Sequence, residues 1–269
     1  MKREAVFQRA DLLPVLPRVI QDLLASFHDD NLPIDALVSR IASDQGLSAK
    51  LLRVANSAYF EVPFTVATVA GAVSMLGFVN VRALVISQGL LACFKDAPGL
   101  DPQQLWVHNM QVAGAARHLG ARLGLNAELA FACGLLHTVG EAVLHLAMPA
   151  EMRVFDQGIA LLAPHRAAAQ RHAFGYTQAE IGGELALRWN FPTLLVQAIA
   201  GSDEPLAQSE WSPLAATLHL ADWFVRAHGA GLTQQALRNA WPNSVAERLA
   251  WADHDALDQL IAWAGVQRH

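Results

Sequence analysis

Residues 131–145, FACGLLHTVGEAVLH, form the stretch that decides the fold. The longer segment 129–148 is apolar apart from a few polar residues, chiefly His137, Glu141 and His145. Such a segment is typical of a helix in the middle of a protein. Because no uninterrupted apolar run reaches the ~18–20 residues that a bilayer requires, we interpret 129–148 and the similar segment 81–94 as core helices and not as membrane spans.

Helical spacing of apolar residues extends over almost the whole chain, as at Leu105, Met110 and Ala113. Glycines and prolines stand where helices would end or begin, for example Gly124 and Pro213. Aromatic residues make up only 7% of the chain, and no Asn-Gly or Asp-Gly pair marks a tight hairpin. We therefore predict an all-α fold built from many short helices.

One polar segment, KDAPGLDP at residues 95–102, interrupts the helical pattern. Two prolines and a glycine in eight residues predict a linker. We expect it to separate an N-terminal helical subdomain (1–94) from a C-terminal one (101–269). The linker is too short to hold two bundles far apart, so they should pack on each other. From Ser244 onward we expect one more amphipathic helix as a C-terminal extension.

Charge and cysteine content exclude several classes of function. The 269 residues hold 19 Lys and Arg against 24 Asp and Glu, a formal net charge of -5. This balance lacks the strong basic character of most nucleic-acid-binding domains, and it weakens attraction to anionic membranes, so we expect neither partner. No signal-peptide pattern follows the charged first residues. Cys93 and Cys133 stand apart with no CxxC pattern, which predicts buried, unreactive thiols and a cytoplasmic location.

Several short motifs in a fixed order carry a family resemblance. They are LPVLP (13–17), IASDQGL (41–47), LRVANSAYF (52–60), AVSMLGF (72–78), LWVH (105–108), GLLH (134–137) and AEIG (179–182). Segment 131–145 resembles the metal-binding core of HD-type phosphohydrolases. Together, the motifs are similar to those of the HD-related output domain (HDOD) family, and the resemblance covers about residues 12–228.

The resemblance implies a compact helical bundle in which an N-terminal helical subdomain packs on a C-terminal HD-like subdomain. Members of the HDOD family are bacterial cytoplasmic proteins tied to signalling. They share their fold with HD and HD-GYP hydrolases but commonly lack a complete metal site, so the resemblance implies no enzymatic activity.

Residue by residue, the metal site of the HD family is degenerate in this chain. His108 and His137 match two ligand histidines, and Asp222 matches the late aspartate. The aspartate that would follow His137 is Thr138, whose neutral hydroxyl is a poor ligand for a divalent ion.

Three further positions depart from the pattern. Gln178 stands in place of a histidine, residues 200–203 in place of a His-His pair, and Glu141 in place of a lysine. We therefore expect no bound cofactor and interpret His137 as a hydrogen-bonded core histidine. A two-histidine, one-carboxylate metal site of His108, His137 and Asp222 is the alternative.

Two other polar groups allow a functional interpretation. His137, Glu141 and His145 are spaced i, i+4 and i+8 and would share one face of a continuous helix, where they could hold a metal; more simply, Glu141 orients an imidazole or faces water. Near Pro164, the residues His165, Arg166, Arg171 and His172 form a basic cluster. It is a candidate for phosphate or partner contacts, against the simpler interpretation of a solvated helix face.

Asn56, Ser57 and Tyr59 stand at the end of a predicted helix. The simplest interpretation is that Asn56 and Ser57 satisfy terminal backbone groups while Tyr59 anchors the turn. A partner surface made of these three residues is the alternative.

From these observations we expect a non-catalytic signal-transduction domain that acts through protein–protein interaction. Its partners would be signalling proteins acting in trans, since the chain shows no receiver or cyclase segment. The alternatives are a metal-dependent phosphohydrolase or phosphodiesterase with an altered ligand set, and a nucleotide-binding sensor without turnover.

Overall fold

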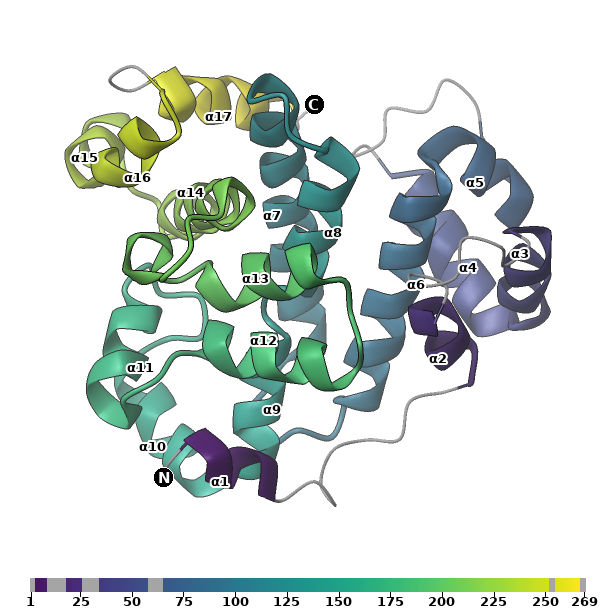
Figure 1. Cartoon of the computed structure of the whole chain (residues 1–269), viewed down its shortest axis with the longest axis horizontal. Helices are drawn as coiled ribbons and strands as arrows, with labels where there is room; N and C mark the ends of the chain where they lie inside the picture. Colours follow the sequence, from purple (N-terminus) through teal and green to yellow (C-terminus); the bar gives the residue numbers. More distant parts are fainter. Residues whose placement is uncertain (1–2, 9–17, 26–33, 58–64, 252–254, 267–269) are drawn as a thin grey trace.

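Short helices joined by short turns build the described chain (Figure 1). The computed structural model describes residues 3–8, 18–25, 34–57, 65–251 and 255–266, and no β-strand occurs among them, which confirms the all-α prediction. In chain order the helices are α1 (Arg3–Gln8), α2 (Arg18–Ala25), α3 (Ile34–Ser43), α4 (Gln45–Ala55), α5 (Val69–Leu76), α6 (Phe78–Cys93), α7 (Pro102–Arg122), α8 (Ala127–Leu136), α9 (Val139–Ala147), α10 (Pro149–Gly158), α11 (Arg166–Phe174), α12 (Gln178–Arg188), α13 (Thr193–Gly201), the 3-10 turn η2 (Pro205–Ala207), α14 (Pro213–Gly229), α15 (Gln234–Ala240), α16 (Asn243–Arg248) and α17 (Asp255–Val266).

Helices α7 and α8 pack along each other at the centre, and both α6 and α14 contact this pair (Figure 1). Their close approach depends on Gly134 of α8, where an added Cβ would lie 2.4 Å from the Cα of Ala113 on α7. Seven consecutive residues of α8, 130–136, are buried. A helix that is apolar on every side needs neighbours on every side, and this is the position that α8 has.

The stretch from Ala127 to Ala147, which spans α8 and α9, is long and apolar enough to cross a membrane by length and composition alone. In the folded protein 83% of its most apolar window is buried inside the molecule. The chain also leaves the helical path between Leu136 and Val139. The interpretation of this stretch as core helices is therefore confirmed.

Helix α6 connects the first part of the chain with the rest: α2, α4 and α5 pack on it, and so do α7 and α8 (Figure 1). Helix α1 instead packs on α9, where Val6 and Phe7 join a second core cluster with Leu105 and Val143. Residues 3–8, which we placed in the N-terminal subdomain, thus contact the other part of the chain. The subdomain boundary itself stays a prediction.

The C-terminal extension consists of two helices, so the prediction of one helix from Ser244 was wrong. Helix α16 ends before Ala250, whose φ of 61° is incompatible with a continuing α-helix. Helix α17 then packs on α7, with Trp263 lying so close to Gly114 that an added Cβ would be 2.7 Å from the indole.

Both cysteines are free thiols whose pKa is raised by burial, in agreement with their predicted low reactivity. Cys133 is fully buried, but Cys93 is only half-buried, which corrects the expectation for that residue.

Candidate functional site

His108 on α7, His137 at the end of α8 and Asp222 on α14 converge on one point inside the protein. Nε2 of His108 on α7 lies 2.8 Å from Oδ1 of Asp222 on α14, and Nε2 of His137 lies 3.3 Å from the same oxygen. One ligand atom from each of the three residues lies within 4.8 Å of the other two. The sequence placed these residues in one site, and the fold brings them together.

The end of helix α8 orients His137. The helix stops at Leu136, and the ring turns back so that Nδ1 lies 2.8 Å from the carbonyl oxygen of Gly134. A carbonyl can only accept a hydrogen bond, so Nδ1 carries the proton. When the ring is neutral, Nε2 carries no proton, and its lone pair faces Oδ1 of Asp222. A proton or another cation relieves this contact between two acceptors.

Arg226 supplies a permanent cation to the same carboxylate. Its Nε donates to Oδ1 and Oδ2 of Asp222 at 2.9 and 2.7 Å, and the arginine side chain is only 7% exposed. Burial alone would raise the pKa of Asp222, but the guanidinium and the two histidines hold it well below its usual value. Our interpretation of the sequence missed Arg226, although a basic residue four positions after an aspartate on a helix is a recognisable ion-pair signal.

His108 is a neutral donor at physiological pH. Burial lowers its pKa to about 4, because desolvation of the cation outweighs the hydrogen bond to Asp222. Its Nε2–H therefore donates to the carboxylate.

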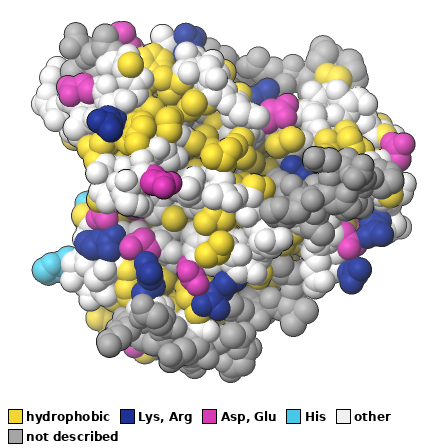
Figure 2. Space-filling model, in the orientation of Figure 1, with side chains coloured by type: hydrophobic (Ala, Val, Ile, Leu, Met, Phe, Trp, Pro, Cys, Tyr) yellow, Lys and Arg dark blue, Asp and Glu magenta, His cyan; other side chains and the backbone are white. Residues whose placement is uncertain are grey.

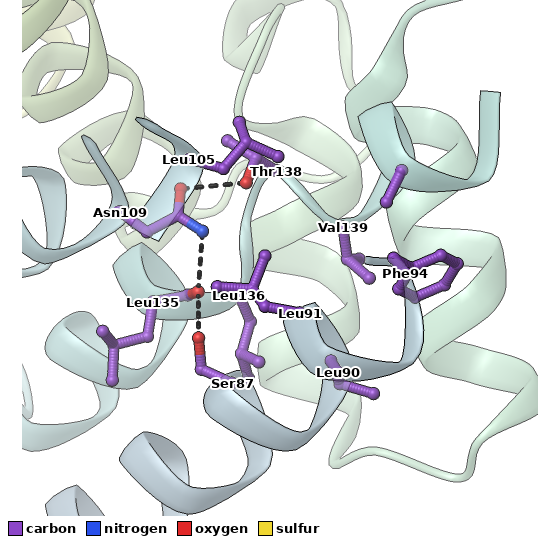
Figure 3. A pocket seen from close by; sticks show the side chains of 11 residues that line it. Ser87, Leu90, Leu91, Phe94, Leu105, Asn109, Leu135, Leu136, Thr138 and Val139 are labelled. Atoms are coloured by element: carbon purple, nitrogen blue, oxygen red, sulfur yellow. Dashed lines mark hydrogen bonds between the residues drawn. The ribbon is translucent and has the colours of Figure 1, made fainter. Parts of the chain in front are cut away.

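Thr138 makes its hydrogen bond to a different part of the core. Figure 3 shows its hydroxyl donating to Oδ1 of Asn109 at 2.9 Å, while Nδ2 of Asn109 and the hydroxyl of Ser87 both donate to the carbonyl of Leu135. These residues line a small, mainly apolar cavity of about 20 Å³ that does not include Asp222. Thr138, the N-cap residue of α9, thus connects the start of α9 with α7 at the position where the HD pattern has a metal ligand.

The three convergent side chains fit a divalent metal only in part. Two imidazoles and one carboxylate are a suitable donor set. Arg226, however, uses both oxygens of Asp222, and its positive charge opposes a second cation at the same place. Thr138, whose hydroxyl bonds to Asn109, offers no carboxylate at its position. The donor set is therefore present, but the carboxylate that a metal would need is bonded by Arg226.

A polar cavity of about 40 Å³ adjoins Asp222 and Arg226. Gln178, Asp203 and His219 also line it. Burial raises the pKa of Asp203, and the buried amide of Gln178 has no hydrogen-bond partner among the described residues. The volume is sufficient for about two or three water molecules, which would satisfy this amide.

Glu141 belongs to a second buried network. Arg166 binds its carboxylate with two hydrogen bonds, at 2.7 and 2.9 Å, and Gln170 donates a third. His145 instead pairs with Asp156 at 2.9 Å. The single face shared by His137, Glu141 and His145 was a wrong prediction, because His137 precedes the first residue of α9. Glu141 does orient an imidazole, but through its backbone carbonyl, which lies 2.8 Å from Nδ1 of His145.

The basic cluster after Pro164 is divided between core and surface. Arg166 is buried against Glu141 and Asp156, so a solvated face was wrong for this residue. Arg171 pairs with Glu180 and Glu204, and only His165 and His172 are exposed without such a pair. Because Glu141 and Asp156 neutralise Arg166, and Glu180 and Glu204 neutralise Arg171, neither arginine is available for a phosphate.

Asn56 and Ser57 satisfy backbone groups at the end of α4. Asn56 bonds the carbonyl of Leu52 and both the N–H and the carbonyl of Val66, and Ser57 donates to the carbonyl of Val54. Tyr59 lies outside the described residues.

Comparison with known proteins gives this geometry a context. Residues 13–205 match the HDOD domain. An uncharacterized protein of Treponema pallidum (strain Nichols) is 28% identical over 228 residues, or 82% of this chain, which spans only 44% of that relative's length.

Three crystal structures resemble the fold. A protein of Shewanella amazonensis SB2B, provisionally named a phosphohydrolase, has a TM-score of 0.78 at 29% identity, over 98% of this chain and 95% of its own. An HDOD domain protein of unknown function from Geobacter sulfurreducens has a TM-score of 0.75 at 20% identity, over 99% and 96%. A protein of Marinobacter aquaeolei VT8, provisionally named a signal transduction protein, has a TM-score of 0.67 at 24% identity, over 96% and 60%. At these identities the last two show the fold alone.

Proposed function

This chain belongs to the HDOD domain family, and we propose that it is a non-catalytic regulatory domain of bacterial signal transduction that acts by binding partner proteins. The observation that carries the proposal is the state of Asp222: its carboxylate is bonded by an internal arginine, and the residue after His137 is a threonine whose hydroxyl bonds to Asn109. The histidine–aspartate cluster then stabilises the junction of α7, α8 and α14. The site of action would be the cytoplasm, with signalling proteins in trans as partners.

Apolar side chains on the surface support the partner-binding part of the proposal. Leu187 and Leu194 flank the turn between α12 and α13, and they are 61% and 62% exposed. In addition, Figure 2 shows hydrophobic side chains gathered on the face of the molecule that it presents, in the region between α13 and α17. Extended apolar surface of this kind is typical of protein interaction sites.

The metal content of the purified protein tests the non-catalytic part. We expect Mn²⁺, Fe²⁺ or Zn²⁺ well below one equivalent after purification without chelator, and no hydrolysis of phosphomonoesters or phosphodiesters. The double variant Thr138→Asp/Arg226→Gln should gain metal, since it adds a carboxylate and removes the competing cation. Stoichiometric metal in the unmodified chain, lost in His108→Ala, would overturn the proposal.

A metal-dependent phosphohydrolase is the second candidate. It is favoured by the position of His137 Nε2, which faces Asp222 as a metal ligand would, and by the name of the Shewanella amazonensis protein. This candidate predicts turnover of a nucleotide or cyclic dinucleotide that stops in Asp222→Asn. A screen of both substrate classes with added Mn²⁺ separates the two candidates.

A further inference from the structure

A groove of about 380 Å³ lies where α4 and α6 meet the start of α7. Its residues are Lys50, Arg53, Val54, Gln88, Leu91, Ala92, Lys95, Pro102, Gln103 and Trp106. The groove shares no residue with the cavity beside Asp222. Its volume falls within the range of ordinary small-molecule sites.

The groove is cationic in an acidic protein. Lys50, Arg53 and Lys95 line it, and no Asp or Glu does, although the chain has a net charge of -5. Lys50 and Arg53 are three residues apart on α4 and so share one side of that helix. All three cations are exposed, and none forms an ion pair with a carboxylate in the described part of the chain.

Two acidic residues lie close to the groove in the sequence, but neither lines it. Asp96 follows Lys95, and Asp101 precedes Pro102 and does not cancel the positive charge. One oxygen of its carboxylate accepts hydrogen bonds from the backbone N–H groups of Gln103 and Gln104, as the N-terminal cap of α7. It is engaged with the helix terminus, whose partial positive charge it balances. The lysine and arginine side chains are left to attract an anion from solution.

The remaining lining residues suit an aromatic body attached to the anionic group. Trp106 is half-buried and, with Leu91 and Val54, provides an apolar wall. Gln88 and Gln103 add amide groups that can both donate and accept hydrogen bonds, as a base edge requires. Cations for phosphates and an indole for stacking are the usual means of holding a nucleotide.

We propose that the groove between α4, α6 and the start of α7 binds a nucleotide with two or more phosphates, which Lys50, Arg53 and Lys95 hold while the base lies against Trp106. This site goes beyond the proposed function and is independent of the histidine–aspartate cluster. A nucleotide there would contact both α4 and α7, and so connect the helices that precede the 95–102 linker with those that follow it.

Isothermal titration calorimetry with ADP, at low ionic strength and without metal, tests the proposal. We expect saturable binding with one equivalent, weakened at least tenfold in Arg53→Glu and in Lys95→Glu. Arg153→Glu is the matched control, because Arg153 is exposed on α10 and its substitution changes the net charge by the same amount. It should bind ADP as the unmodified chain does. All variants should keep the same urea midpoint, since the three side chains are exposed.

Inorganic pyrophosphate separates the two parts of the proposed site. We expect ADP to bind at least tenfold more tightly than pyrophosphate; equal affinities would overturn the contact between base and Trp106. The absence of ADP binding at millimolar concentration, or an equal loss in Arg153→Glu, would overturn the site itself. Binding of an acidic peptide in place of ADP would overturn it as well and identify the groove as a protein-docking surface. None of these outcomes depends on metal content, so the proposed function is tested separately.

Discussion

Arg226 balances the charge of the buried site at the scale of a single residue. It is the permanent cation beside Asp222, and its Nη1 also donates to the carbonyl of Leu161 at 3.1 Å. His108 donates a hydrogen bond to this carboxylate, but it is uncharged near pH 7 because burial lowers its pKa to about 4. The stability of Asp222 in its charged form therefore depends on the arginine.

Arg226→Met should destabilise the fold by about 3–5 kcal/mol, because it leaves a buried carboxylate unpaired. Urea unfolding at pH 7 measures this effect. The double variant Asp222→Asn/Arg226→Met should recover part of the loss, since no unpaired charge remains. A single variant as stable as the unmodified chain would show that Asp222 needs no cation.

The lowered pKa of His108 predicts a loss of stability in acid. Between pH 6.5 and about 4, His108 binds a proton in the unfolded chain but not in the folded chain. The free energy of unfolding therefore falls as the pH falls. The loss should total about 3 kcal/mol. The lowered pKa values of Asp222 and Glu141 take effect only below their usual values, at lower pH.

Urea midpoints of the unmodified chain and of His108→Gln between pH 7 and 4 test this. The slope should be shallower in His108→Gln and unchanged in His172→Gln, whose side chain is exposed. The raised pKa of Asp203 acts with the opposite sign, but it is common to all three proteins and cancels in the comparison. Parallel curves for the unmodified chain and His108→Gln would contradict the prediction.

At the scale of elements, the site depends on helices that approach within backbone contact. Gly140 on α9 faces the start of α12, where an added Cβ would lie 1.9 Å from the carbonyl oxygen of Gln178 and 2.7 Å from the N of Gly182. These are backbone atoms and cannot rotate away. Separating α9 from α12 would also move Gln178 and Glu141, which both line the polar cavity.

Gly140→Ala should therefore lower the free energy of unfolding by about 1–3 kcal/mol, the usual range for overpacking in a rigid core. Gly158→Ala is the matched control, because an added Cβ at the end of α10 meets nothing within 4 Å. The control should be neutral or more stable by up to about 1 kcal/mol. Thermal unfolding of both variants distinguishes the two effects, and an equal outcome would show that α9 and α12 can separate freely.

At the scale of the whole molecule, one core cluster extends from Ile20 on α2 to Leu260 on α17. Helix α6 contributes to it while touching helices from both sides of the 95–102 linker. Helix α1 adds a second connection, from the beginning of the chain to α9. A continuous core of this kind favours cooperative unfolding over independent subdomains.

We predict a single unfolding transition, and the distribution of tryptophans makes it measurable. All 7 tryptophans follow the linker, so their fluorescence reports the second part of the chain, whereas far-UV circular dichroism reports every helix. The two urea curves should coincide. A fluorescence midpoint clearly separate from the dichroism midpoint would show that the predicted subdomains 1–94 and 101–269 unfold independently.

The sequence by itself determined the class of fold and three side chains of the central site, whereas Arg226 was missed. Helical spacing and the positions of glycine and proline are local properties, and they predicted the all-α architecture. The motif order identified His108, His137 and Asp222 because a family pattern assigns positions without coordinates.

Only the tertiary structure decided how those residues are paired. His108 bonds to Asp222, Arg166 neutralises Glu141, and Thr138 bonds to Asn109. Each of these contacts joins segments that are far apart in the sequence. The basic groove is also tertiary, because its cations come from α4 and from the residue after the α6 C-cap while its tryptophan comes from α7. Charge compensation depends on distance in space, and separation along the chain does not specify that distance.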